Sequence, residues 1–244
     1  MNALSMAIAP AIGVYIYQNF NYTIAFSLAL FTAIISIIII QFVKDKDEPI
    51  ITTNTNFKLE IIDKNVVPIA FIMMMFAIPY CATQSFLVTY VEAKQLDIHI
   101  SLFFPAYAIA LLILRLSLKS LFDKLPFGII FTSSIICASL SIYFLHVMQN
   151  NFDMLIAAIF MAGGTGIINS VCQSTALLLA PKNKRGLANS TFYIGIDLGM
   201  ALGPIIAGIF YEHFSLDLFY PLFFFTIPLA ITGFFFYHQK AKKF

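Results

Sequence analysis

The chain has 244 residues, of which 60% are hydrophobic and only 11% are charged. Soluble domains carry about 25% charged residues, so this composition, with a mean hydropathy of +0.90, excludes an ordinary soluble protein. The net charge of +2 by itself indicates no particular class of binding partner. Nucleic acid is not an expected partner. The three cysteines are Cys81, Cys137 and Cys172, and they lie far apart inside apolar runs. This placement favours a role as small core residues over a disulfide framework or a metal site.

Long apolar segments dominate the chain. A hydrocarbon core about 30 Å thick is crossed by about 20 apolar residues in a helix. Eight segments meet this requirement or come close to it: 1–17, 22–43, 66–91, 100–121, 127–148, 154–180, 187–211 and 218–238. The predicted fold class is therefore an all-α, multi-pass membrane bundle, surrounded by lipid.

The first segment has a counterpart near the end of the chain. A shift of 194 residues aligns Leu4–Phe20 with Leu198–Phe214, and seven of the seventeen positions are identical. Internal repeats of this kind are typical of transporters. Before the second copy, the chain continues back to Arg185 within the same segment. The first copy begins almost at Met1, so we expect the chain to be truncated at its N-terminus.

One polar linker interrupts the apolar pattern, with KDKDEP followed by TTNTN. We expect residues 1–43 to be the last two helices of a truncated N-terminal half, residues 44–65 a cytoplasmic linker, and residues 66–244 a six-helix unit. Within the linker, Phe57–Ile62 could form a short helix at the membrane surface or an ordinary solvated loop.

Basic residues predict the orientation, because cytoplasmic loops carry an excess of Lys and Arg. When the loops are assigned alternately to two sides, thirteen of the fourteen basic residues fall on one side and only Lys94 on the other. The loops after Val43 and Ala180, and the C-terminus, are therefore expected to be cytoplasmic.

The segment at 187–211 combines three unusual features. Gly195, Gly199, Gly203 and Ala207 recur every four residues, which predicts a smooth face for close packing of another helix. Asp197, the one charge expected well inside the bilayer, points away from that face. Pro204 and Gly208 should then bend or thin the helix. A buried charge, a glycine face and a proline together favour a protein that moves solutes across a membrane.

Two patterns resemble the major facilitator superfamily. Ala9, Pro10 and Gly13, with a second copy at Gly199, Gly203, Pro204 and Gly208, resemble the antiporter motif of its drug and metabolite exporters, although Ala9 departs from the usual Gly. Arg115, Asp123 and Lys124 resemble its cytoplasmic loop signature, although Lys119 stands where the family has Gly. The resemblance implies that the eight segments correspond to helices five to twelve of that fold.

The resemblance also implies which polar residues would line a central cavity. The segments at 66–91 and 154–180 would face it, and each carries polar side chains at helical spacing: Tyr80, Thr83 and Gln84 in the first, and Thr165, Asn169 and Gln173 in the second. The alternative is that these groups only form hydrogen bonds between helices.

Charged residues have two readings each. Asp197 could exchange a proton during coupling or could anchor its helix to a neighbour. Arg115, Asp123 and Arg185 could form a cytoplasmic gating loop or could be plain positive-inside residues.

The sequence as a whole predicts a secondary active transporter in the cell membrane, with a cytoplasmic C-terminus. The favoured hypothesis is a proton-coupled exporter, an efflux antiporter of small molecules, with protons, the substrate and a separate N-terminal half as partners. The alternatives are a proton-coupled importer and a transport-inactive fragment. No enzyme motif, cofactor motif or metal-binding pattern is present in the sequence, so no catalytic residue is expected.

Overall fold

A computed structural model describes residues 21–42, 60–117 and 125–241. The first predicted segment, with Pro10 and Gly13, lies outside the described residues, and so does Asp123 of the predicted gating loop. The structure divides into two units, 1–59 and 60–244, which are treated separately here.

The described part of the first unit is one helix, α2 (Tyr22–Gln41). Asn21 caps it by accepting a 2.8 Å hydrogen bond from the Tyr22 amide. Its hydroxyl groups bond to the helix's own backbone, as the 2.8 Å bond from Ser27 Oγ to the Thr23 carbonyl illustrates. These bonds leave an outer surface that is almost entirely apolar, as a membrane-spanning helix requires.

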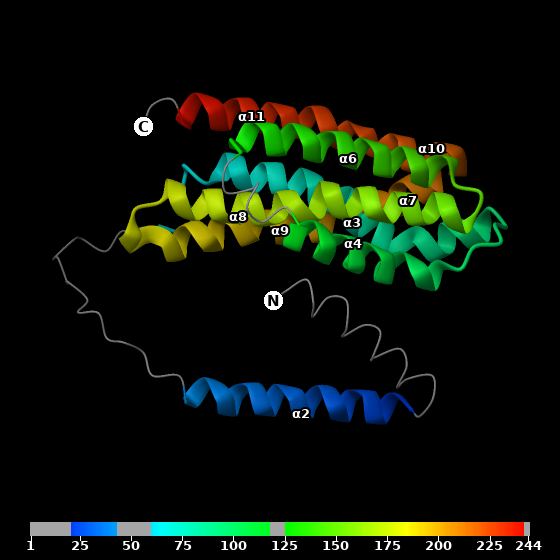
Figure 1. Cartoon of the computed structure of the whole chain (residues 1–244), viewed down its shortest axis with the longest axis horizontal. Helices are drawn as coiled ribbons and strands as arrows, with labels where there is room; N and C mark the ends of the chain where they lie inside the picture. The colour runs from blue at the N-terminus through cyan, green and yellow to red at the C-terminus, as the bar shows by residue number, and fades with distance from the viewer. Residues whose placement is uncertain (1–20, 43–59, 118–124, 242–244) are drawn as a thin grey trace. The chain divides into compact units, whose positions relative to one another are not determined.

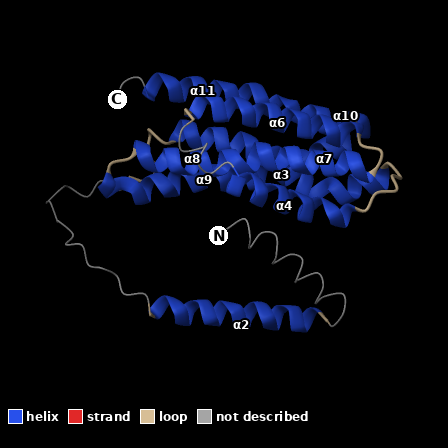
Figure 2. Cartoon of the chain, viewed as in Figure 1, coloured by secondary structure: helices blue, strands red, loops and turns tan. Residues whose placement is uncertain are grey.

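The second unit is a bundle of long helices that run alongside one another (Figure 1). Its elements are α3 (Val67–Ala93), η1 (Ile100–Leu102), α4 (Phe103–Ser117), α6 (Phe127–Val147), α7 (Asn151–Met161), η2 (Ala162–Gly166), α8 (Ile167–Leu179), η3 (Lys182–Lys184), α9 (Arg185–His213), α10 (Leu216–Leu222), η4 (Phe223–Phe225) and α11 (Thr226–Ala241). Figure 2 shows that the described part of the chain is helical, without strands.

Seven helices in the described ranges are long and apolar enough to cross a membrane, which confirms the predicted all-α, multi-pass fold. The sixth predicted segment starts earlier than expected, at Asn151, because the Asn150 side chain caps it with bonds to the amides of Phe152 and Asp153. The helix α9 continues through Pro204 to His213.

The helix α9 packs most extensively against α3, and glycine makes this possible. A Cβ atom on Gly195 would lie 2.4 Å from the Ala70 carbonyl oxygen, and one on Gly199 would lie 2.6 Å from Ala77 Cβ. A Cβ atom on Gly203 would likewise meet the backbone of α3. The predicted smooth face is therefore confirmed. Gly208 is outside it, because a Cβ there would meet only the tip of Phe86 at 3.7 Å.

A π-helical turn, η2, joins α7 to α8 within a single span. Its glycines allow close neighbours on both sides. A Cβ on Gly164 would lie 3.0 Å from the Ala138 amide nitrogen of α6, and one on Gly166 only 2.4 Å from Leu111 Cδ1 of α4. Such turns interrupt the regular helix hydrogen bonding and are frequent at functional sites.

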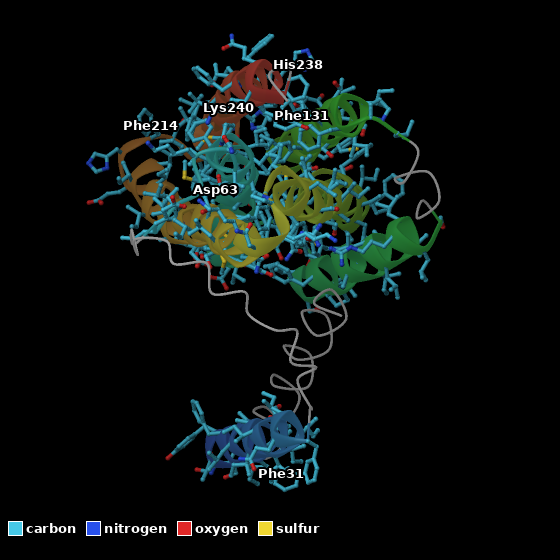
Figure 3. All side chains as sticks on the ribbon, turned by 90° about the vertical axis from the view of Figure 1, so that its left-hand side faces the viewer. Phe31, Asp63, Phe131, Phe214, His238 and Lys240 are labelled. Carbon is cyan, nitrogen blue, oxygen red and sulfur yellow. The ribbon has the colours of Figure 1, made fainter. Side chains whose placement is uncertain are left out.

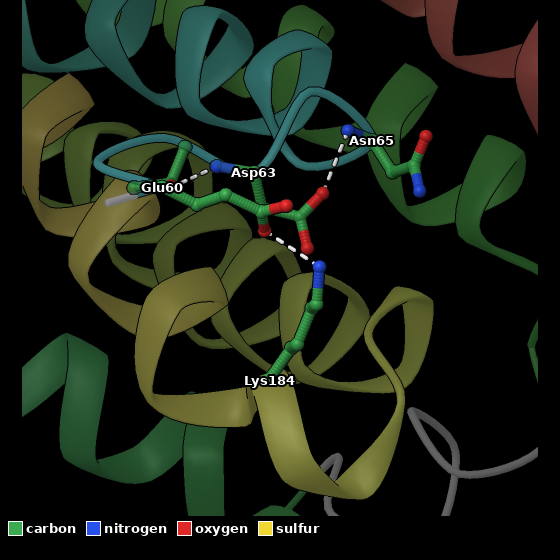
Figure 4. Close-up of polar contacts among 5 residues, drawn as sticks. Glu60, Asp63, Asn65 and Lys184 are labelled. Atoms are coloured by element: carbon green, nitrogen blue, oxygen red, sulfur yellow. Dashed lines mark hydrogen bonds and ion pairs between the residues drawn. The ribbon is translucent and has the colours of Figure 1, made fainter. Parts of the chain in front are cut away.

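A short lead-in segment, residues 60–66, binds the start of α3 to neighbouring helices. Figure 3 looks at the bundle from the end at which Asp63 and Lys240 lie. The Asp63 amide donates a 2.9 Å bond to Thr191 Oγ1 of α9, and the Asp63 carboxylate accepts a 2.9 Å bond from the Asn65 amide (Figure 4). Lys184 and Glu60 form a 2.6 Å ion pair beside it.

Candidate functional site

Four polar side chains from three elements form a tyrosine cluster: Tyr80 and Gln84 of α3, Tyr107 of α4 and Thr165 of η2. Gln84 Nε2 donates a 3.1 Å hydrogen bond to the Tyr80 hydroxyl. The rings of Tyr80 and Tyr107 are 5.3 Å apart between centroids and tilted by 35°. The Thr165 and Tyr80 side chains are polar neighbours of the Tyr107 hydroxyl. The cluster offers two aromatic faces and several donors and acceptors in one place.

Helix geometry explains how α3 presents Tyr80 and Gln84 together. The two residues are four apart, so they share one face of the helix. Thr83 lies on a different side: only 1% of it is exposed, and its hydroxyl donates a 2.8 Å bond to the Pro79 carbonyl. The structure thus brings Tyr80 and Gln84 to the cluster and leaves Thr83 in the core.

Thr165 reaches the cluster from the π-helical turn. Its hydroxyl donates to the Met161 carbonyl at 2.8 Å, and the residue is 7% exposed. The next turn carries Asn169, which is half-buried on α8.

A second group, the amide cluster, joins α8 to α9. Gln173 Nε2 donates a 3.1 Å hydrogen bond to the Tyr193 hydroxyl and a longer one, 3.4 Å, to Asn189 Oδ1. Asn189, Tyr193 and Asp197 follow at intervals of four along one face of α9. Asp197 is exposed there, opposite the buried glycines, and forms no ion pair with another described residue.

Three of these residues were not among the predicted cavity residues: Tyr107, Asn189 and Tyr193. Tyrosine has an apolar body, so in a membrane segment it does not stand out from its neighbours. A usable signal was present nevertheless, since Tyr107 is eight residues before Arg115 and Tyr193 is four before Asp197, both on shared helix faces.

The two predicted gating residues that the structure describes occupy helix ends. Arg115 lies in the last turn of α4 rather than in a loop, and it donates a 3.4 Å hydrogen bond from its guanidinium to the Gly166 carbonyl. Arg185 is the first residue of α9.

At the other end of the bundle, Lys94 caps α3 and forms a 2.9 Å ion pair with Asp217 of α10. Its ammonium also lies 5.1 Å from the centroid of the Tyr90 ring. Partial burial lowers the pKa of Lys94, but hydrogen bonds to Tyr90 and Asp217 outweigh burial, so the pKa lies above its ordinary value.

Within the described ranges, no three His, Cys, Asp or Glu side chains come close enough together to hold a metal ion. The polar side chains of the two clusters are hydroxyl, amide and phenol groups.

Comparison with known families decides what kind of protein carries these clusters. The sequence pattern of the Major Facilitator Superfamily matches residues 1–151 and 129–243. The chain belongs to the Major Facilitator Superfamily. It is thus a multi-pass membrane protein of a transporter family, as the resemblance of its motifs indicated.

Two curated proteins of Bacillus subtilis (strain 168) are similar to this superfamily member. The lincomycin resistance protein LmrB is 31% identical over 91 residues, which cover 37% of this chain and 18% of LmrB. The uncharacterized MFS-type transporter YhcA is 25% identical over 117 residues, which cover 46% of this chain and 21% of YhcA. The aligned stretches therefore span about a fifth of each relative's length. No solved structure matches the chain.

Proposed function

We propose that this chain forms the substrate-binding part of a secondary active transporter that exports small molecules in exchange for protons. The observation that carries the proposal is the tyrosine cluster, in which α3, α4 and η2 direct polar side chains to one place. Polar groups in membrane segments are costly unless they face protein, water or a ligand, and they often mark a solute pathway. The similarity to a lincomycin resistance protein favours export.

Each part of the site would have a distinct task. The tyrosine rings would stack on an apolar or planar part of the substrate, and the Gln84 amide would bind a polar part. Asp197 would take up and release the coupled proton from its exposed face of α9. The close α3–α9 contact would let these two helices move as one body during the alternation between inward-open and outward-open states.

The proposal also includes the surroundings of the chain. The loop at Lys182–Gly186 and the C-terminus would be cytoplasmic, which agrees with the distribution of basic residues. Residues 44–65 would link two transmembrane halves, and a separately supplied N-terminal half would complete the transport pathway.

Efflux in a bacterial host that lacks its own drug exporters tests the proposal. The chain is expressed alone and together with an N-terminal half. The tolerance of the cells to lincomycin is measured, together with the efflux of two preloaded probes, cationic ethidium and the aromatic carboxylate fluorescein. We expect efflux from the combination, and its loss when the proton gradient is collapsed. Tyr107→Phe, which removes the hydroxyl near Thr165 but keeps the ring, should weaken efflux several-fold at equal protein abundance.

Three results would contradict the proposal. Efflux that survives collapse of the proton gradient would exclude proton coupling, and accumulation of the probe instead of efflux would indicate import. If none of the probes is transported, either by the chain alone or by the chain with an N-terminal half, drug export is not the function.

A further inference from the structure

The direction of the Arg115 side chain is unusual for a basic residue near the end of a membrane helix. Such residues commonly extend toward the water beyond the helix end. Arg115 instead turns back along α4, because its guanidinium donates to the carbonyl of Gly166, which lies in the π-helical turn. Helical side chains lean toward the N-terminus of their helix, which favours this direction.

Close packing fixes the place of the guanidinium. Leu111 lies one turn before Arg115 and packs against Gly166. A Cβ atom added to Gly166 would be only 2.4 Å from Leu111 Cδ1. The lack of a side chain on Gly166 therefore lets α4 approach η2, and this approach brings the guanidinium to the carbonyl. Gly166 directly follows Thr165, so the guanidinium reaches the same π-helical turn that contributes Thr165 to the tyrosine cluster.

The charge of Arg115 has no compensating carboxylate in the described part of the chain, where the ion pairs join Lys94 to Asp217 and Lys184 to Glu60. Its Nε atom is buried without a hydrogen-bond acceptor. A hydrogen bond of 3.4 Å to one carbonyl is weak. A half-buried guanidinium with unused donors strongly favours an anionic partner.

The neighbours of Arg115 narrow the kind of anion. A guanidinium is planar and can bind the two oxygens of a carboxylate at once. The tilted rings of Tyr107 and Tyr80 provide aromatic faces nearby, and Thr165 provides a hydroxyl. This combination suits a planar, ring-bearing carboxylate better than a small inorganic anion.

We propose that Arg115 gives the tyrosine cluster its specificity for small aromatic carboxylates, which it would bind through their carboxylate oxygens. The inference rests on the proposed transport function, since it names the class of substrate, but its test measures binding and needs no transport.

Three probes of nearly equal shape and different charge test the inference: benzoate, benzamide and benzamidine. The purified chain is reconstituted in lipid nanodiscs, and its thermal unfolding is followed with a thiol-reactive fluorogenic dye. The chain suits this assay, because Cys81 and Cys172 are buried and Cys137 is partly buried until unfolding exposes them. The absence of Trp rules out the usual intrinsic fluorescence readout.

We expect benzoate, at about ten times its dissociation constant, to raise the unfolding midpoint by about 3 °C, whereas neutral benzamide and cationic benzamidine should not. Arg115→Gln should weaken benzoate binding at least about tenfold, and Arg115→Lys should restore only part of it, because an ammonium lacks the planar pair of donors. Lys182→Gln, which removes the same charge from an exposed position, is the matched control and should bind benzoate normally.

Several results would overturn the inference. These are the absence of a benzoate-induced shift in the unaltered chain, equal shifts with all three probes, or benzoate binding that Arg115→Gln leaves intact. If Arg115→Gln fails to fold, then benzoate binding by Arg115→Lys as tight as in the unaltered chain would still contradict the bidentate contact. Failure of the efflux experiments would leave these binding results unaffected, so the two proposals can fail separately.

Discussion

A polar side chain inside a membrane span needs a partner, and individual residues of this chain find theirs in different ways. Gln84 and Gln173 bond across to tyrosine hydroxyls, whereas Thr83 and Thr165 bond back to their own helix. The first kind of bond joins elements or neighbouring turns, and it includes the exposed side chains of Gln84 and Tyr193. The second kind satisfies the hydroxyl proton within the helix and leaves only the oxygen of the side chain free to accept a further bond.

Asp197 offers a direct test of proton coupling. Asp197→Asn keeps the size and most of the hydrogen-bonding capacity of the side chain but removes the titratable group. If Asp197 carries the coupled proton, substrate binding and exchange without a gradient should persist, while uphill transport driven by a pH gradient should fall at least about tenfold. Gradient-driven transport and membrane abundance are measured together, with Asp197→Leu for comparison. Normal gradient-driven transport by the Asn variant would exclude Asp197 from coupling.

Asp63 should matter for stability rather than for transport. Its carboxylate accepts a bond from the Asn65 amide at the start of α3, and it is only 9% exposed. Asp63→Ala should lower the free energy of unfolding by about 1 kcal/mol, because it removes a partly buried hydrogen bond in the turn before α3. Thermal unfolding in nanodiscs measures the change. Asp97→Ala, at an exposed position, is the control, and an equal effect of the two substitutions would contradict the stabilising role of the Asp63–Asn65 bond.

Residue types predicted part of the site. Tyr80, Gln84, Thr165 and Gln173 were singled out because polar groups stand out in apolar segments, and their place in a substrate cavity stays a prediction. Tyr107 and Tyr193 were not, because their partners lie far away in the chain and only the packed bundle brings them together. Thr83 has the same polarity and spacing as its neighbours, yet its rotamer places the hydroxyl on its own backbone, and rotamers are not encoded in spacing.

At the scale of elements, the α3–α9 pair depends on the absence of side chains. Gly199→Ala would place a methyl group 2.6 Å from Ala77 Cβ and 2.8 Å from the Met74 carbonyl oxygen, so the helices would have to separate. We expect a loss of about 2 kcal/mol or more, and a lower yield of folded protein, because overpacking moves the backbone. Thermal unfolding and membrane abundance measure this effect.

Gly186→Ala is the matched control for that substitution. It lies in the first turn of the same helix, and its added Cβ would meet nothing within 4 Å. Alanine is the better helix former, so this variant should be neutral or more stable by up to about 1 kcal/mol. Equal tolerance of the two substitutions would mean that the close contact of α3 and α9 is wrong.

The sequence located the helices well because a membrane span must be long, apolar and internally hydrogen-bonded, and all three demands are local. The four-residue spacing of Gly195, Gly199 and Gly203 predicted a packing face for the same reason. The partner of that face was not predictable, since a smooth surface accepts any helix that approaches it. The close fit of Gly166 against Leu111 was likewise beyond the sequence, because it depends on how α4 and η2 cross.

At the scale of the whole molecule, orientation is the prediction to test. Cysteine is introduced singly at Gly186 and at Gln149, both exposed, in a background that lacks Cys81, Cys137 and Cys172. If the basic end of the bundle is cytoplasmic, an impermeant thiol reagent added to intact cells should label the Gln149 site and spare the Gly186 site. Permeabilised cells provide the control, in which both sites should react. Labelling of the Gly186 site in intact cells would reverse the assigned orientation.

The lead-in segment also indicates a position at which a foreign sequence can be inserted before the six-helix unit. The Asp63 amide donates to Thr191 of α9, and Lys184 of η3 donates to the Glu60 carboxylate. Lys240 of α11 donates to the Lys64 carbonyl. The start of α3 is therefore held in place by bonds to its own bundle. A protease site or a fluorescent reporter inserted just ahead of Glu60 would leave these bonds intact, which makes this position suitable for split-protein complementation.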